Sequence, residues 1–250
     1  MRIFVSFKQT VTMATERPNK HAIQGMIYTL LKGTNYATVH DKNHVKQFTF
    51  SDWFKKKDGG RYLIISSPDD DFIRSIAGIL EKNVGKLKFL DYVLNGVELV
   101  NTKSTRFLRS ASPVVLVRDG KRNEYHSFKK RTLTLKEFDD LIKNSLVRRY
   151  RIHSGNPDFS IKGPLFDAFD FRKEVPVRVD IRGREFLVIG STWNKLILAR
   201  NKSREEFYKW IMDVGIGQKN SLGFGCVQPY PWEPSKNKRN DLTEKWEIYV

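Results

Sequence analysis

Hydrophobic and polar positions in the first part of the chain follow two different repeats. Apolar side chains alternate with polar ones at the start, where Ile3, Val5 and Phe7 share one face, and this period of two predicts a strand. From residue 20 to 32 the apolar positions fall three and four apart, which predicts an amphipathic helix. A second helix is predicted after the acidic segment at residues 68–71, because carboxylates stabilise a helix N-terminus.

Three further apolar runs in this part predict strands between and after the two helices. They are residues 45–54, 62–67 and 86–94. The predicted order is therefore β-α-β-β-α-β, which is the ferredoxin-like arrangement.

The second part of the chain repeats this order less regularly. Thr134 and Glu137 form a capping-box pattern before one helical stripe, and Ser203 and Glu206 form another before a stripe that Gly215 ends. The predicted strands of this part are residues 113–117, 175–181, 185–200 and 222–230.

These patterns predict an α+β fold of two tandem ferredoxin-like (βαββαβ) units with a C-terminal glycine-rich loop. We expect the first unit at residues 1–100, a linker at 101–112 and the second unit at 113–250. The glycine-rich loop then connects the last helix of the second unit to its last strand.

The charge balance of the chain indicates what kind of partner it binds. The chain carries 45 Lys and Arg against 28 Asp and Glu, a net charge of +17. Such an excess favours a polyanionic partner, most often nucleic acid, and the alternative that the charge leaves open is a solvated basic surface. Cys226 is the only cysteine, which excludes an internal disulfide and a cysteine-based zinc cluster. We read no signal peptide and no membrane span, and we expect a cytoplasmic protein.

The stretch GIGQKNSLGFG at residues 215–225 holds two G-x-G pairs and one lysine. It matches neither the dinucleotide fingerprint nor the Walker loop. Glycines allow backbone N–H groups to approach phosphates closely, and Lys219 adds a positive charge. The alternative is a tight helix–strand turn that needs positive φ angles. Two pairs in a basic chain favour phosphate contact.

The loop has the pattern G-h-G-x5-G-h-G, where h is a hydrophobic residue, and it closes a second ferredoxin-like unit. This pattern resembles the glycine-rich loop of the CRISPR-associated endoribonucleases of the RAMP superfamily, the sixth Cas family, which process precursor CRISPR RNA. The stretches IQGMIYTLL (23–31), HDKNHVKQFTFS (40–51) and STW (191–193) are also similar to family motifs. The resemblance implies metal-independent cleavage, in which the ribose 2′-OH attacks the adjacent phosphorus. The products are a 2′,3′-cyclic phosphate and a 5′-OH.

The same resemblance implies three catalytic residues: His40, Lys46 and Tyr28. Histidine titrates near neutrality and suits acid or base work, and lysine can stabilise developing negative charge. Tyr28 lies off the apolar stripe of its predicted helix, so its phenol is available to a ligand. His44 lies in the same segment as His40, and the residues alone leave open which of the two serves.

The sequence also offers a set of residues for RNA binding, in the glycine-rich loop and in two basic runs. The alternative for each basic run is a solvated face. The candidates are Gly215, Gly217, Lys219, Gly223, Gly225, Lys55, Lys56, Lys57, Lys129, Lys130 and Arg131.

We therefore expect an endoribonuclease that binds CRISPR repeat RNA (precursor crRNA) and cuts within the repeat, with no metal and no cofactor. Other Cas proteins and a second copy of the chain are further candidate partners. The first alternative is a non-catalytic RNA-binding RAMP subunit of a CRISPR effector complex. The second is a basic structural or ribosome-associated protein, against which the complete glycine loop argues.

Overall fold

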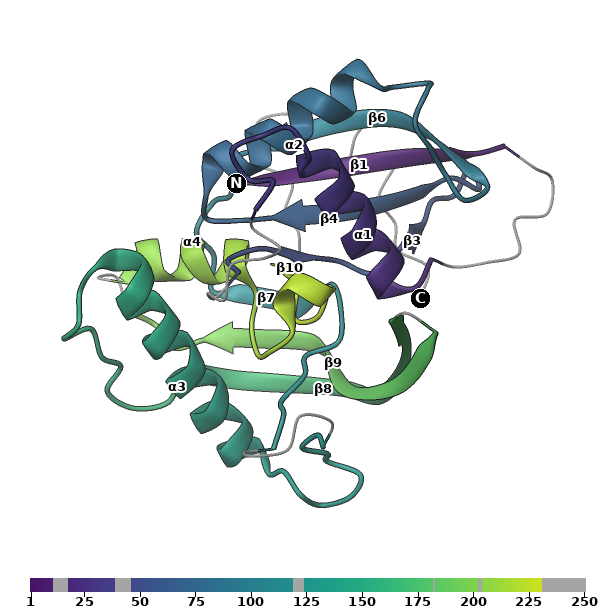
Figure 1. Ribbon diagram of the computed structural model, residues 1–250. Coiled ribbons are helices and arrows are strands. Elements are labelled where there is room, and N and C mark those ends of the chain that lie inside the picture. The colour runs from purple at the N-terminus through teal and green to yellow at the C-terminus, as the bar shows by residue number, and fades with distance from the viewer. Residues whose placement is uncertain (11–17, 39–45, 119–123, 182, 202–203, 231–250) are drawn as a thin grey trace.

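Two antiparallel sheets lie one beside the other in the computed structural model, and each carries two helices on one face (Figure 1). The structure describes residues 1–10, 18–38, 46–118, 124–181, 183–201 and 204–230. Predicted residues His40 and His44 lie outside these described ranges.

The first sheet has the strand order of a ferredoxin-like unit. Its main strands run in the order β2-β4-β1-β6, so the first strand lies between the third and the fourth. A short strand β5 extends this path beyond β6, and β3 pairs with β4. The elements are β1 (Arg2–Gln9), α1 (Lys20–Leu31), β2 (Thr49–Phe50), β3 (Phe54–Lys55), β4 (Arg61–Ser66), α2 (Asp70–Lys82), β5 (Lys88–Phe89) and β6 (Tyr92–Val100).

Both helices of this unit begin where the sequence offers a side-chain cap. The Asn19 side chain accepts a hydrogen bond from the Ala22 N–H, and Asp69 accepts one from the Phe72 N–H. Such bonds satisfy backbone donors that have no partner inside the helix. The apolar faces of α1 and α2 then pack on the alternating residues of β1, where Ile3 and Val5 are fully buried.

The second sheet repeats the same order. Its path β10-β7-β9-β8 again places the first strand between the third and the fourth. The elements are β7 (Phe107–Ser110), α3 (Leu135–Ser154), β8 (Phe166–Ile181), β9 (Arg184–Leu198), α4 (Glu205–Val214), the 3-10 helix η2 (Asn220–Leu222) and β10 (Val227–Pro229). The predicted α+β class with two ferredoxin-like units is therefore confirmed.

The first strand of the second unit lies elsewhere than predicted. It is β7, inside the stretch that the sequence predicts as a linker, and the predicted strand at 113–117 forms only isolated bridges. Pro113 has no N–H to donate, and Val114 and Val115 bridge to residues in two separate segments. Val114 and Val115 are nonetheless buried, so this apolar run contributes to the hydrophobic core without forming a regular strand. The division of the chain into domains stays a prediction.

The apolar run at residues 86–94 is a hairpin rather than one strand. Lys88 pairs with Val93 and Phe89 with Tyr92, so the chain turns between them. At this turn Leu90 adopts the left-handed region with φ 53°, which branched side chains seldom enter. The run contains no glycine, so its sequence does not indicate a turn.

Two other predicted strands are shorter than expected. In the 45–54 run Thr49–Phe50 pairs with β4 and Phe54 pairs with it again as the start of β3, while between them the Asp52 N–H donates to the Ala111 carbonyl of the other unit. In the 222–230 run only Val227–Pro229 pairs, and the residues before it belong to the glycine-rich loop.

The two predicted capping boxes have different outcomes. At α3 the Thr134 side chain accepts from the Glu137 N–H, and the Glu137 carboxylate accepts from the Thr134 N–H. This box is confirmed. Ser203 lies outside the described residues, and the N-cap of α4 is Arg204, which makes no side-chain capping bond.

Candidate active site

The glycine-rich loop follows α4 and packs between the two units. All four glycines of its G-x-G pairs are buried and have positive φ angles between 68° and 81°. A Cβ atom on Gly215 would lie 2.6 Å from the Gly225 carbonyl oxygen, and one on Gly217 would lie 2.7 Å from that of Val115. A Cβ on Gly223 would overlap the Phe50 ring. Glycine is therefore required at these positions both for the backbone angles and for the close packing.

Three of these glycines use their N–H groups inside the protein. Gly215 donates to Ile211, Gly223 to Asn220, and Gly225 to Pro113. This arrangement favours the turn interpretation for these three residues. Phosphate contact by the loop stays a prediction.

Lys219 is half-buried at the tip of the loop. It adopts the left-handed region with φ 58°, and its Nζ lies 5.8 Å from the centroid of the Tyr125 ring. Burial lowers the pKa of the Lys219 ammonium from its ordinary value. The lysine therefore extends over an aromatic ring of the second unit, next to the cluster formed by Val115, Val179 and Phe224.

Helix α1 holds the loop from the first unit. The buried Lys20 donates from Nζ to the Gly223 carbonyl and to Asp52 Oδ1, each at 2.6 Å. Its Nζ also lies 4.9 Å from the Phe224 ring centroid. One turn later, Gln24 Nε2 donates to the Ser221 carbonyl at 2.8 Å.

Tyr28 follows one turn beyond Gln24 on the same face of α1. Its half-buried ring packs edge-on against Phe48, with 6.0 Å between ring centroids. Burial raises the pKa of the Tyr28 phenol above its ordinary value, and hydrogen bonds with Gln24 and Ser221 oppose that rise. The phenol is thus protonated at neutral pH and lies beside the loop.

Lys46 comes from the segment before β2 and reaches the same place. Its Nζ lies 5.7 Å from the centroid of the Tyr28 ring, within cation–π distance. The structure therefore brings together two of the three predicted catalytic residues, while His40 and His44 lie outside the described part of the chain. Their roles in catalysis stay predictions.

The other predicted RNA contacts lie elsewhere. Lys55 is exposed on β3, and the Lys56 Nζ donates to Ser6 Oγ at 2.9 Å. Lys57 follows in the turn after β3. The remaining three, on the second unit, are exposed in the turn before α3: Lys129, Lys130 and Arg131.

Sequence reasoning found Tyr28 but missed Lys20 and Gln24, the two residues that bond α1 to the loop. Lys20, Gln24 and Tyr28 stand four apart, and residues four apart share one face of a helix. That spacing could have indicated a polar stripe that begins with a lysine. It could not have named Ser221 or Gly223 as the partners, because they lie far along the chain.

Two negative findings concern the described residues alone. Among residues 1–10, 18–38, 46–118, 124–181, 183–201 and 204–230, no three His, Cys, Asp or Glu side chains are grouped so that they could hold a metal ion. No helix within these ranges is long and apolar enough to cross a membrane.

Two ferredoxin-like units with a buried glycine-rich loop between them define the fold class of this protein, and comparisons with known proteins add the family. The family model described as "CRISPR associated protein Cas6, C-terminal" matches residues 97–229. "CRISPR-associated endoribonuclease Cas6 2" of Methanocaldococcus jannaschii is 35% identical over 243 residues, which cover 92% of this chain and 99% of that protein. The chain therefore belongs to the Cas6 family.

More distant relatives are also similar over nearly the whole chain. "CRISPR-associated endoribonuclease Cas6" of Haloferax mediterranei is 26% identical over 90% of this chain and 92% of its own length. A solved structure titled "CRISPR associated protein Cas6" superposes with a TM-score of 0.63 at 23% identity, covering 92% of this chain and 98% of that one. Another, titled "An RAMP protein binding different RNA substrates", has a TM-score of 0.63 at 19% identity, covering 92% and 99%. At these identities the structures support the fold.

Proposed function

We propose that the protein is an endoribonuclease that binds CRISPR repeat RNA and cuts it within the repeat. Its relatives in Methanocaldococcus jannaschii and Haloferax mediterranei are named CRISPR-associated endoribonucleases. The similarity to the first of them covers nearly the whole length of both proteins. The observation that carries the proposal is the meeting of Tyr28 and Lys46 beside the glycine-rich loop. A net charge of +17 suits a polyanionic substrate.

The proposed reaction is an internal transesterification without a metal ion. The 2′-OH loses its proton and its oxygen attacks the adjacent phosphorus, while the bond from phosphorus to the 5′-oxygen breaks. The leaving 5′-oxygen takes up a proton, so the products are a 2′,3′-cyclic phosphate and a 5′-OH. The reaction needs a proton acceptor, a proton donor and positive charge near the phosphorane.

Each proposed residue has a role that suits its chemistry. His40 transfers a proton, because an imidazole titrates near neutral pH. Lys46 stabilises the negative charge that develops on the phosphorane oxygens. Tyr28 is a protonated phenol that can donate to the 2′-oxygen or to a phosphate oxygen. Lys219 and the exposed basic runs contribute charge for the RNA backbone.

The decisive experiment is single-turnover cleavage of the repeat RNA from the genome that encodes this chain. We expect cleavage to persist in EDTA and to stop when the nucleotide at the cut carries a 2′-deoxy sugar. Activity that chelation abolishes and Mg²⁺ restores would contradict the metal-free reaction.

Variants of the two neighbouring histidines identify the proton-transfer residue. We expect His40→Ala to slow cleavage by roughly 10²–10⁴-fold with little change in RNA affinity, and His44→Ala to be milder. The opposite order would mean that His44 is the catalytic histidine. A wild-type protein that binds repeat RNA but never cuts it would favour the RNA-binding RAMP subunit.

A further inference from the structure

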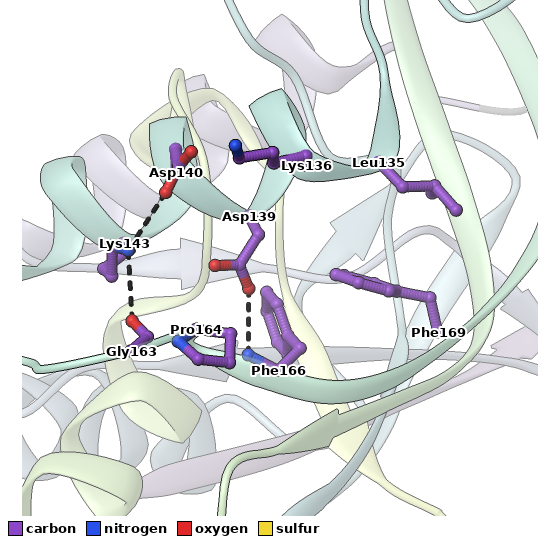
Figure 2. A pocket seen from close by; sticks show the side chains of 9 residues that line it. All are labelled: Leu135, Lys136, Asp139, Asp140, Lys143, Gly163, Pro164, Phe166 and Phe169. Carbon is purple, nitrogen blue, oxygen red and sulfur yellow. Dashed lines mark hydrogen bonds and ion pairs between the residues drawn. The ribbon is translucent and has the colours of Figure 1, made fainter.

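A cavity of about 450 Å³ opens between the first turns of α3 and the start of β8 (Figure 2). None of the residues that line it belongs to α1 or to the glycine-rich loop. Its walls are mainly apolar, with Phe166 and Phe169 on one side and Leu135 on the other (Figure 2). Leu135 leaves 48% of its surface exposed. The volume lies within the range of about 300–1,000 Å³ that is usual for small-ligand sites.

The aromatic wall of this cavity continues along β8. Phe169 and Phe171 both contact the buried Trp193, with ring centroids 5.6 Å and 5.3 Å away, so both lie on the same side of the strand. Phe171 is 39% exposed and packs 5.1 Å from Phe128. Phe128 directly precedes the exposed basic turn at residues 129–131. An apolar stripe thus leads from the cavity to three positive charges.

The carboxylates around the cavity are already bonded within the protein. Asp139 accepts from the N–H groups of Leu165 and Phe166 at 3.0 and 2.9 Å. Asp140 accepts from Lys143 at 3.0 Å (Figure 2). Lys136 is exposed at the rim and forms no ion pair within the described part of the chain, since the Asp140 carboxylate one turn along α3 pairs with Lys143.

We propose that this α3 groove, defined by Leu135, Lys136, Phe169 and Phe171, binds unpaired nucleotides of the RNA outside the cleavage site. The bases stack on the two phenylalanine rings, and the phosphates lie near Lys136 and the basic turn. Stacking on aromatic rings combined with positive charge is the usual way in which single strands are held. The proposal rests on the proposed function and adds a second contact with the same RNA.

Two features define what the groove selects. Phe169 lies opposite Leu196 in the register, on the buried helix side of the sheet, so the groove is separate from the open sheet face. The Asp139 carboxylate, the groove's buried acceptor, is occupied by backbone donors. Base recognition here is therefore by stacking and tolerates different sequences.

The test uses repeat RNA with a 2′-deoxy sugar at the cut, whose binding is followed by fluorescence anisotropy at several salt concentrations. Phe171→Leu keeps the apolar volume and removes the ring, and we expect it to weaken binding roughly five- to tenfold. Phe107→Leu is its matched control, because Phe107 is 45% exposed on β7 and lies outside the groove. Lys136→Glu should weaken binding and flatten its salt dependence, unlike Lys82→Glu on α2.

A direct readout comes from photo-cross-linking with a short oligouridylate that contains 5-iodouridine, which couples to aromatic rings stacked on the base. We expect cross-links at Phe169 or Phe171, and cleavage of saturating repeat RNA at the wild-type rate in both groove variants. If wild-type protein binds and cuts the RNA while both variants match their controls and no cross-link forms, the groove inference fails alone. Wild-type protein that binds no RNA would overturn the proposed function and this inference together. A groove variant that alters only the oligomeric state would show that a protein segment occupies the groove.

Discussion

Lys20 offers the most direct test of how the glycine-rich loop is held. Its side chain is 8% exposed, and its ammonium donates to the Gly223 carbonyl and to Asp52. Lys20→Met keeps the aliphatic stem and removes the charged donor. The variant therefore leaves the buried Gly223 carbonyl without the donor that the lysine supplies.

The expected loss of stability follows from these two partners. A buried acceptor that loses its donor costs about 1–3 kcal/mol. Asp52 adds little, because its side chain is 46% exposed and regains water when the lysine is gone. We expect a free energy of unfolding lower by about 2 kcal/mol. For a chain of this size that corresponds to a fall in melting temperature of roughly 4–8 °C.

Urea and thermal unfolding measure this difference, with Lys32→Met as the control. Lys32 is exposed at the C-terminal end of α1, so its replacement removes the same charge without touching the loop. We also expect slower cleavage by Lys20→Met at temperatures where it is folded, because Ser221 and Tyr28 then lose their fixed relation. Equal stability of the two methionine variants would refute the assignment of Lys20 as the residue that fastens the loop.

Two further predictions concern local structure. Gly223→Ala should lower the free energy of unfolding by clearly more than Gly155→Ala. Both glycines have positive φ angles (81° and 68°), but of the two only a Cβ at residue 223 meets a neighbour, the Phe50 ring. Unfolding free energies of the two variants measure the difference, and equal losses would contradict the prediction. Thr134→Ala should lower the melting temperature at neutral pH and less so in acid, measured as a melting curve at each pH. The Thr134 backbone N–H and, to a smaller extent, its hydroxyl lower the pKa of Glu137. The variant removes only the hydroxyl's share, which is present above the unfolded-state pKa and is lost as pH falls through the folded-state value.

Elements with a strong local signal were predictable from the sequence. The helices α1, α2 and α3 combine an apolar stripe with a capping side chain, and each begins within a residue or two of its prediction. The short strand β7 carries little such signal, since its pattern is four residues long and one of its apolar residues, Phe107, faces outward. Its pairing with β9 and β10 is a long-range property that no local window contains.

The candidate site was predictable only in part for the same reason. Tyr28 and Lys46 came from a resemblance to a family, and the helical period placed Tyr28 on the polar side of α1. The motif predicts the glycine loop but not the burial of its glycines, because that burial depends on Phe50 and Val115 from elsewhere in the chain. A local stretch of sequence indicates where glycine's backbone freedom is needed. It does not indicate which atoms from distant segments pack against the glycines.

The candidate site lies where the two units meet. Tyr28 and Lys46 belong to the first unit and Ser221 to the second, and Thr49 Oγ1 donates to the Phe224 carbonyl across the same junction. Arg2 on β1 donates to the Met212 carbonyl at the end of α4, immediately before the loop. Because these bonds fall on both sides of the loop, its position depends on the docking of the units. Any change that separates the units would therefore disturb the candidate catalytic residues before it unfolds either sheet.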